Sequence, residues 1–228
     1  MSGSTRDAVM GRLRRAVGAN PANDAERRAA VAARLSDAPK GVIPARGQLP
    51  PAERLELFIQ MATKADATVT RVDAASDIPE EVAAYLRERN LAPAIRMGRD
   101  PRLAGLDFSR TTLTVTTGPS EGDDLSSLSH AVGAIAETGT LVLTSGPDNP
   151  TSLNFLPEYH LVVLDAADVA GDMEAVLARL RQTHGKGTMP RSVNFVTGPS
   201  RSADIEQTLL LGAHGPRSLH ILVVGEPA

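Results

Sequence analysis

The segment "HLVVLDAADVAGDMEAVLARLRQ", residues 160–182, decides the fold class of this chain. Residues 160–165 form an apolar run of the kind found in strands that are buried on both faces. Residues 172–182 instead place apolar side chains at helical spacing between charged ones. A buried strand followed by a helix is the repeating unit of parallel sheets, because the helix carries the chain back across the sheet.

The same alternation extends in both directions from this segment. Further strands are predicted at 68–72, 92–98, 111–117, 140–145, 192–198 and 219–224. Further helices are predicted around 55–62 and at 78–90, 126–136 and 202–211. Strands and helices in alternation indicate an α/β fold, with a largely parallel sheet flanked by helices on both faces.

The first 48 residues differ from the rest and are predicted to form a helical arm. Two helices are expected at 5–17 and 24–35, and the Pro- and Gly-rich stretch at 37–54 is typical of a linker. We therefore place the arm and its linker at residues 1–48 and an α/β domain at residues 49–228. The arm carries nine Lys and Arg against four Asp and Glu, whereas the domain carries 15 against 23. Such an arm either docks on an acidic partner or is simply a solvated pair of helices.

The composition excludes several classes of function. The formal net charge of −3 gives the molecule as a whole no nucleic-acid or membrane signature. The absence of cysteine excludes disulfides, thiolate metal sites and a cysteine nucleophile. The histidines are not paired at helical spacing, so no metal site is predicted. Because neither a bilayer-length apolar stretch nor a secretory signal is present, the protein is expected in the cytoplasm.

Three predicted strands end in a Gly-Pro turn. The turns are Thr-Gly-Pro-Ser at 117–120 and 197–200, and Ser-Gly-Pro at 145–147. If the three strands are parallel, their turns lie on one rim of the sheet, and open α/β sheets bind ligands at the carboxyl ends of their strands. The repeat therefore predicts a ligand site at this rim, although Gly-Pro is also a common turn without function.

The turn at 197–200 leads into a predicted helix and is the first candidate binding segment. Its candidate residues are Gly198, Ser200, Arg201 and Ser202. Together they would offer backbone N–H groups, hydroxyls and a guanidinium at the positive end of the helix, which favours an anion. The structural alternative is that a serine only caps the helix. The segment does not match Gly-x-Ser-x-Gly, so a serine hydrolase is not predicted.

The second candidate segment surrounds Glu137, which precedes a predicted strand. A carboxylate at the rim of a sheet can act as a base or a nucleophile, or it can cap a neighbouring element. His160, at the start of another strand, is either a proton shuttle or a hydrogen-bonded structural histidine. The remaining candidates lie in the turn after Glu137, at the rim and near the C-terminus: Thr138, Gly139, Thr140, Ser145 and His214.

Both segments resemble the LUD domain family. The resemblance is carried by "AETGTLVLTSGP" at 136–147, "LPEYHLVV" at 156–163 and "TGPSRSADIEQTLLLGAHGP" at 197–216. Ser202 stands where the family pattern more often has Thr. The resemblance covers residues 49–228 and implies a fold similar to that of sugar-phosphate isomerases and CoA transferases.

The resemblance also implies a part in the bacterial conversion of L-lactate to pyruvate. It implies partner subunits, at least one of which bears iron–sulfur clusters, and this chain would then be the accessory subunit that holds no cluster. No cofactor is identified for the chain itself.

We expect residues 137–140 and 198–202 to converge on a small carboxylate or phosphate ligand. Arg201 would grip the anion, and Glu137 with either His160 or His214 would handle protons. Two alternatives remain open. One is a scaffold subunit without a ligand site, and the other is a stand-alone isomerase or CoA-transferase-like enzyme that uses Glu137.

Overall fold

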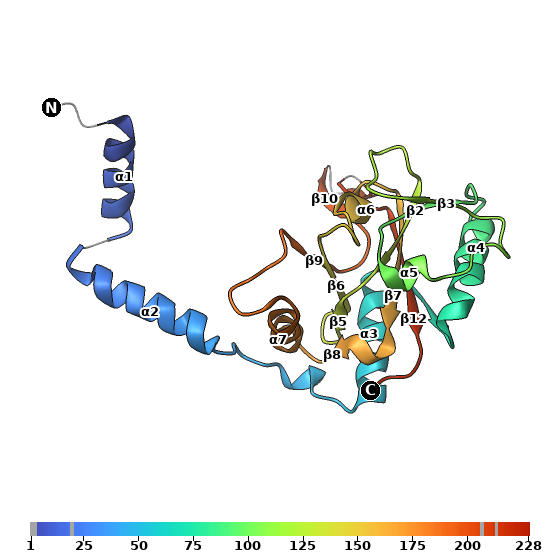
Figure 1. Cartoon of the computed structure of the whole chain (residues 1–228), viewed down its shortest axis with the longest axis horizontal. Coiled ribbons are helices and arrows are strands. Elements are labelled where there is room, and N and C mark those ends of the chain that lie inside the picture. The colour runs from blue at the N-terminus through green and yellow to red at the C-terminus, as the bar shows by residue number, and fades with distance from the viewer. Residues whose placement is uncertain (1–3, 19–20, 206–207, 213) are drawn as a thin grey trace. The chain divides into compact units, whose positions relative to one another are not determined.

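The computed structural model describes residues 4–18, 21–205, 208–212 and 214–228. The chain divides into two units, Met1–Val42 and Ile43–Ala228 (Figure 1). The first unit contains the helices α1 (Thr5–Ala16) and α2 (Asp24–Asp37), close to the predicted bounds, with a 3₁₀ helix at Pro21–Asn23. In the described part of this arm, neither α-helix buries a side chain. The division into domains at residue 48 stays a prediction.

Six strands form the main sheet of the second unit. They are β1 (Thr68–Val72), β2 (Ala94–Met97), β3 (Thr114–Thr117), β4 (Ser126–His130), β7 (Tyr159–Asp165) and β12 (Ser218–Val224). Their order is β1-β12-β7-β4-β2-β3, and every neighbouring pair is parallel. The predicted α/β class, with a largely parallel sheet flanked by helices, is confirmed.

A second sheet contains four short strands. They are β5 (Gly133–Ile135), β6 (Thr140–Thr144), β8 (Val169–Ala170) and β9 (Val193–Val196), in the order β8-β5-β6-β9. β6 runs antiparallel to both of its neighbours. The predicted strands at 140–145 and 192–198 therefore form outside the parallel sheet, because an apolar run shows that a strand is buried but not with which strand it pairs.

Helices cover both sheets (Figure 1). They are α3 (Pro51–Lys64), α4 (Ile78–Glu88), α5 (Pro101–Ala104), α6 (Ser152–Phe155) and α7 (Met173–His184), with 3₁₀ helices at Ala45–Gly47, Ala75–Asp77 and Ala166–Asp168. Val82 of α4 packs in one core with Leu161, while Phe58 of α3 packs in another with Val162 and the second sheet. Val176 of α7 packs against the other face of the second sheet. Among the described residues, no helix combines the length and apolar character required to cross a membrane.

The prediction of a helix at 126–136 is wrong, because this segment forms β4 and β5. All five residues of β4 are buried. Ser127 Oγ donates a 2.7 Å hydrogen bond to the Leu153 carbonyl, and Ser129 Oγ donates one of 3.2 Å to Asn154 Oδ1. Ser127 and Ser129 are thus satisfied within the core, which a pattern based on hydrophobicity alone does not reveal.

The prediction of a helix at 202–211 is also wrong. The segment contributes β10 (Arg201–Ile205) and β11 (Thr208–Leu211), which pair antiparallel to each other. A short apolar run such as 209–211 is compatible with either a helix or a strand. Residues 198–202 therefore lead into a strand, and the positive helix end that was expected to attract an anion does not form there.

Candidate functional site

A cleft of about 300 Å³ lies at the amino ends of β7 and β12. Its walls come from α6, the start of β7, the end of β9 with its following turn, and the turn before β12. Five of the residues predicted from the sequence line it: His160, Gly198, Ser200, Arg201 and His214. The cleft thus unites residues from two of the motif segments, 156–163 and 197–216.

The inner end of the cleft contains two buried polar side chains, His160 and Asn154, each 1% exposed. His160 Nε2 lies 3.1 Å from the hydroxyl of Ser129, the same hydroxyl that donates to Asn154 Oδ1. Among the described residues, neither His160 Nδ1 nor Asn154 Nδ2 has a hydrogen-bond partner. A buried polar atom without a partner costs about 1–3 kcal/mol, so two of them at one cleft mark it as a candidate ligand site.

Burial lowers the pKa of His160 to about 3 from its ordinary value of 6.5. A protonated ring would hold its positive charge in the protein interior without contact with water, and this is unfavourable. The ring is therefore neutral near pH 7. It can accept or donate a hydrogen bond to a ligand, but it does not present a positive charge.

Two glycines bring the two predicted segments together at the C-terminal end of α3. Gly139 (φ +67°) and Gly198 (φ +71°) pack so closely that an added Cβ would lie 2.3 Å and 1.9 Å from backbone atoms of Ala62 and Ala65. Close by, Thr140 Oγ1 lies 2.7 Å from Thr197 Oγ1, and Thr197 lines the cleft. The segment that follows Glu137 therefore does contact the segment of the cleft.

The carboxylate of Glu137 nevertheless lies apart from the cleft. Glu137 follows β5, is 7% exposed, and places Oε2 3.8 Å from Nε of Arg46 in the 3₁₀ helix Ala45–Gly47. Thr138 Oγ1 lies 2.7 Å from Thr140 Oγ1. Ser145 lies at the opposite end of the β6–β9 pair, where its hydroxyl accepts from Ser192 N. Neither Glu137 nor Ser145 is thus brought to the two histidines of the cleft.

Arg201 lines the cleft, but its guanidinium already has protein partners. Nη1 lies 3.0 Å from Asp66 Oδ2, and Nη2 donates to the carbonyl of Ala65. Ser200 is fixed through its backbone N–H, which donates to the Pro216 carbonyl at 2.8 Å, while His214 is exposed. The side chain of Ser202 lies outside what the structure describes.

The three Gly-Pro turns do not share one rim, contrary to the prediction. Because β6 and β9 are antiparallel, the turns at 145–147 and 197–200 lie at opposite ends of this pair. The turn at 117–120 is tied to α6 instead, where Ser120 N donates to Ser152 Oγ at 3.0 Å.

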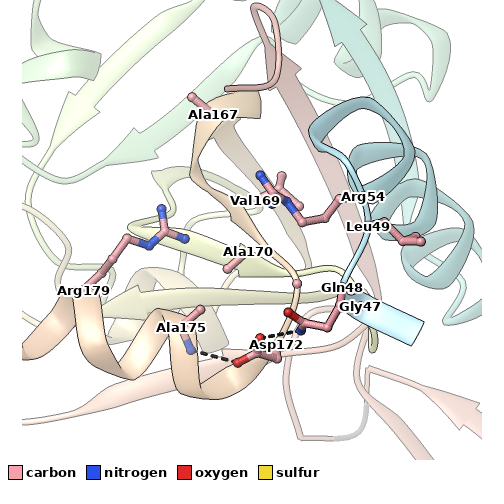
Figure 2. A pocket seen from close by; sticks show the side chains of 11 residues that line it. Gly47, Gln48, Leu49, Arg54, Ala167, Val169, Ala170, Asp172, Ala175 and Arg179 are labelled. Carbon is pink, nitrogen blue, oxygen red and sulfur yellow. Dashed lines mark hydrogen bonds between the residues drawn. The ribbon is translucent and has the colours of Figure 1, made fainter. Parts of the chain in front are cut away.

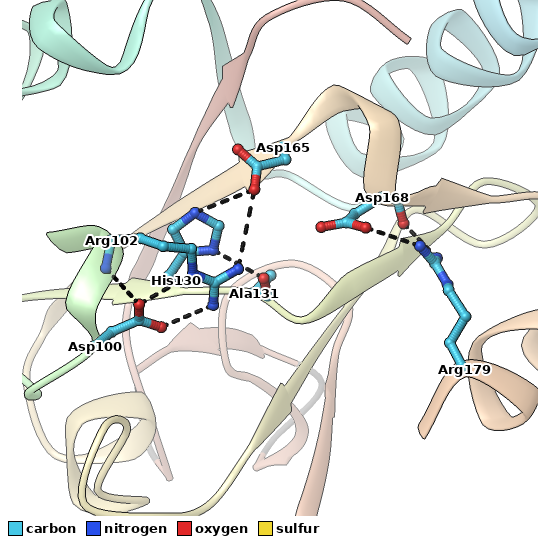
Figure 3. A network of polar contacts seen from close by, with 7 residues as sticks. All are labelled: Asp100, Arg102, His130, Ala131, Asp165, Asp168 and Arg179. Carbon is cyan, nitrogen blue, oxygen red and sulfur yellow. Dashed lines mark hydrogen bonds and ion pairs between the residues drawn. The ribbon is translucent and has the colours of Figure 1, made fainter. Parts of the chain in front are cut away.

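A charged network occupies the carboxyl ends of the parallel strands (Figure 3). Asp100 accepts hydrogen bonds of 2.7 and 3.0 Å from the guanidinium of Arg102. His130, at the end of β4, places Nε2 3.6 Å from Asp165 Oδ2, and its Nδ1 lies 2.9 Å from the Ala131 carbonyl. Since these groups satisfy one another, we assign the network to holding the segment before β3 against the sheet.

A further pocket of about 400 Å³ lies where residues 47–49 meet residues 167–172 (Figure 2). Gln48 Nε2 donates to Asp172 Oδ2 at 2.8 Å, and the other carboxylate oxygen of Asp172 accepts from Ala175 N. A Cβ on Gly47 would lie 2.1 Å from the Gly171 carbonyl oxygen. None of the residues predicted from the sequence lines this pocket, and its contacts hold two segments together.

Four residues in and behind the cleft carry no motif that identifies them from the sequence: Ser129, Asn154, Phe155 and Phe195. Phe155 and Phe195 are each 42% exposed, although both are large and apolar. Asn154 and Phe155 stand directly before the Leu-Pro-x-x-His motif, and this position is the one signal that points to them. Ser129 is visible only once the pairing of β4 with β7 is known.

The fold and the cleft define an α/β protein with a cleft at the amino ends of two parallel strands. Residues 125–224 of the chain match the model of the LUD domain. This match confirms the resemblance to the LUD domain family that the three motif segments indicated.

Particular relatives can be named as well. The chain is 36% identical over 92 residues to lactate utilization protein C of Shouchella clausii, covering 40% of this chain and 40% of that protein. It is 38% identical over 91 residues to lactate utilization protein C of Bacillus subtilis, covering 39% of this chain and 38% of that protein. The matched stretch is therefore well under half of the length of these relatives.

A solved structure is similar over a longer stretch. It is the crystal structure of a DUF162 family protein from Deinococcus radiodurans, with a TM-score of 0.55 and 24% sequence identity. The similarity covers 78% of this chain and 99% of that chain. At this identity the likeness shows the fold alone.

Proposed function

We propose that this chain is an accessory subunit of a bacterial lactate utilization system and that its cleft holds a small anionic ligand. One observation carries the proposal: residues from two separate motif segments, His160 from one and Ser200 and His214 from the other, line the same cleft. The similarity to lactate utilization protein C supports the pathway.

The oxidation of L-lactate to pyruvate removes a pair of electrons and a pair of protons from the substrate. This chain has no cysteine and so no thiolate with which to hold an iron–sulfur cluster. In the proposed system the electrons pass to partner subunits that bear such clusters. The accessory subunit would bind and orient the small acid, or its oxidised product, beside them.

Charge in the cleft is concentrated at Arg201, which is paired with Asp66 at 3.0 Å. A ligand carboxylate in the cleft would compete with Asp66 for the same guanidinium. The proposal therefore makes opposite predictions for the two partners of this ion pair. Removing the cation should weaken anion binding, and removing the competing carboxylate should strengthen it.

Calorimetric titration of the full chain with L-lactate, pyruvate and ribose 5-phosphate tests this proposal. We expect at least one of these anions to bind, with weaker binding to Arg201→Gln and tighter binding to Asp66→Asn. Both positions are exposed, and Asp66 has a φ of +63°, a conformation that asparagine tolerates well, so both variants should fold. Equal affinities for all three chains, or no binding to any of them, would contradict a cleft that holds an anion.

The partners are tested by purifying the full chain from its native host and measuring iron and lactate-dependent dye reduction in the eluate. We expect both to accompany the chain, and a recombinant chain alone should reduce no dye. If the basic arm is the docking element, then Arg27→Glu combined with Arg28→Glu should release the partners. Association that persists in this variant would place the contact elsewhere on the molecule.

A further inference from the structure

Helix α1 presents an exposed apolar stripe. Val9, Leu13 and Val17 follow one another at intervals of four residues, so they lie on one side of the helix, and each is more than half exposed. Arg12 and Arg14 lie on either side of this stripe, because each residue advances about 100° around the helix. The helix has 12 residues, and an isolated helix of this length is marginal in water. It therefore gains stability from any surface that covers the stripe.

A second group of exposed apolar side chains lies on the compact unit, at the cleft and beside it. Phe155 and Phe195 line the cleft, and Leu156 follows Phe155 directly. The carbonyl of Leu125 accepts from Tyr159 N at 3.0 Å, which holds Leu125 beside the segment that follows α6. Leu125, Phe155, Leu156 and Phe195 are between 38% and 50% exposed, and we call these four residues the apolar patch.

The stripe and the patch belong to two concentrations of exposed apolar surface. Among the described residues, fourteen large apolar side chains are exposed, of which eight lie within residues 9–43 and four form the apolar patch. Single exposed apolar side chains scattered over a surface are ordinary and need no explanation. Two concentrations of them instead indicate surfaces that contact a partner.

The apolar patch has acidic neighbours. Segment 120–125, Ser-Glu-Gly-Asp-Asp-Leu, ends at the first residue of the patch and carries Glu121 and Asp123, which are both exposed. The segment is held at α6, where Ser120 N donates to Ser152 Oγ at 3.0 Å. Acids beside an apolar patch complement arginines beside an apolar stripe. The chain as a whole shows the same division, since the first 48 residues are basic and the remainder is acidic.

We propose that α1 of one copy docks on the apolar patch of a second copy. The apolar stripe of the helix packs against the patch, and the arginines beside the stripe face the carboxylates of segment 120–125. This inference goes beyond the proposed function and does not rest on it, because no ligand takes part in the contact.

The position of the apolar patch favours a second copy over the arm of the same chain. Residues 43–49 connect the arm to the compact unit and reach the segment after β8, where Gln48 Nε2 donates to Asp172 Oδ2 at 2.8 Å. β8 and α6 lie toward opposite ends of the compact unit (Figure 1). The arm of the same chain would have to return along the unit to reach the patch, whereas the arm of a second copy is free of this constraint.

Sedimentation equilibrium of the full chain, from micromolar to submillimolar concentration, tests the contact. Because the interface is small, we expect reversible association with a Kd on the order of 10–100 µM, which weakens at high salt. Leu13→Asp on the stripe and Leu156→Asp on the patch should each weaken association at least about tenfold. The matched control is Met189→Asp, at a side chain that is 55% exposed outside the patch, and it should associate like the wild type. Association that is unchanged in Leu156→Asp would overturn the proposal.

Charge reversal identifies the two sides of the contact. An arm variant carries Arg12→Glu with Arg14→Glu, and a patch variant carries Glu121→Arg with Asp123→Arg. Each variant alone should stay monomeric, because its arm and its patch then carry like charges. An equimolar mixture of the two should associate again, because each arm then meets the opposite charge. All four positions are exposed, so both variants should fold. A mixture that stays monomeric would contradict docking between copies.

Two further results would assign the stripe to another partner and overturn the proposal. One is a monomeric wild-type chain in which Leu156→Asp shifts the NMR signals of α1, since the arm would then dock on the patch of its own chain. The other is a monomeric chain that binds vesicles of phosphatidylglycerol and loses this binding in Leu13→Asp, since the stripe would then lie on anionic lipid. Neither result bears on the anion titrations that test the proposed function.

Discussion

At the scale of single residues, the cleft depends on a histidine that is kept neutral. His160 is 1% exposed, and burial lowers its pKa to about 3. The residue is identified by its motif, since it stands in the Leu-Pro-x-x-His segment. The motif does not reveal the protonation state of His160, because the burial of the ring and its contact with Ser129 arise from the pairing of β4 with β7.

The depressed pKa of His160 predicts a dependence of stability on pH. Above pH 6.5 neither the folded nor the unfolded chain protonates this ring. As the pH falls from 6.5 toward 3, the unfolded chain takes up a proton that the folded chain does not. The free energy of unfolding should then fall by up to about 1.4 kcal/mol per pH unit through this residue alone.

The measurement is urea denaturation at about pH 7.5 and about pH 5, applied to His160→Gln and to the wild-type chain. We expect the wild type to lose about 2 kcal/mol more than His160→Gln between these values. An identical loss in the two proteins would contradict a His160 ring that stays neutral in the folded state.

At the scale of elements, the cleft exists because two turns fit against the end of α3. Gly198 has a positive φ and leaves no space for a side chain beside the Ala65 carbonyl. Gly139 makes the equivalent contact with the backbone of α3 one turn earlier. Together they bring β6 and β9 to the helix, and the Thr140–Thr197 contact joins the two segments there.

This contact predicts different costs for two glycine substitutions. Gly187 has a φ of +77°, and no described atom lies within 4 Å of an added Cβ, so Gly187→Ala should cost only about 1–2 kcal/mol of backbone strain. Gly198→Ala carries the same strain and also places its Cβ 1.9 Å from a carbonyl oxygen. It should cost about 2 kcal/mol or more beyond the control.

Chemical denaturation measures both values. Equal losses of stability in Gly198→Ala and Gly187→Ala would show that the turn at 197–200 is not packed against α3 as described. Loss of ligand binding in Gly198→Ala at a temperature where the variant remains folded would further connect this contact to the cleft.

Helix 172–182 is recognisable because its apolar side chains repeat with the helical period. Strand 160–165 is recognisable as a short continuous apolar run, and strand 68–72 by its β-branched residues. β4 is not, since Ser127 and Ser129 are buried although they are polar, and their hydrogen-bond partners on α6 lie 26 and 25 residues away in sequence. β10 and β11 are missed because a short run of leucines is compatible with both a helix and a strand. The pairing between the two strands decides that strands form.

Only part of the candidate site can be predicted, because the sequence does not show how the strands pair. The motifs identify the turn at 197–200 and His160, but they do not give the direction of β6 relative to β9. That direction separates Ser145 from the cleft. The position of Arg46 likewise places Glu137 in an ion pair at 3.8 Å.

At the scale of the whole molecule, the chain consists of an exposed arm and a compact unit. In the described part of the arm, α1 and α2 bury no side chain. The compact unit has its own cores, built from both faces of the main sheet and from the second sheet. The stability of the compact unit should therefore not depend on the arm.

Limited digestion with trypsin tests this independence. Lys40 is exposed between α2 and the compact unit, so cleavage should proceed through the arm and leave a resistant fragment that begins at Gly41. The fragment should unfold at the same temperature as the intact chain, by circular dichroism. A lower unfolding temperature for the fragment would show that the arm stabilises the α/β unit.

The most direct test of the proposed function is a crystal structure of the full chain with L-lactate. We expect the acid at the amino ends of β7 and β12, with its carboxylate beside Arg201. An acid bound instead at the carboxyl ends of the strands, beside His130 and Asp165, would contradict the proposed cleft.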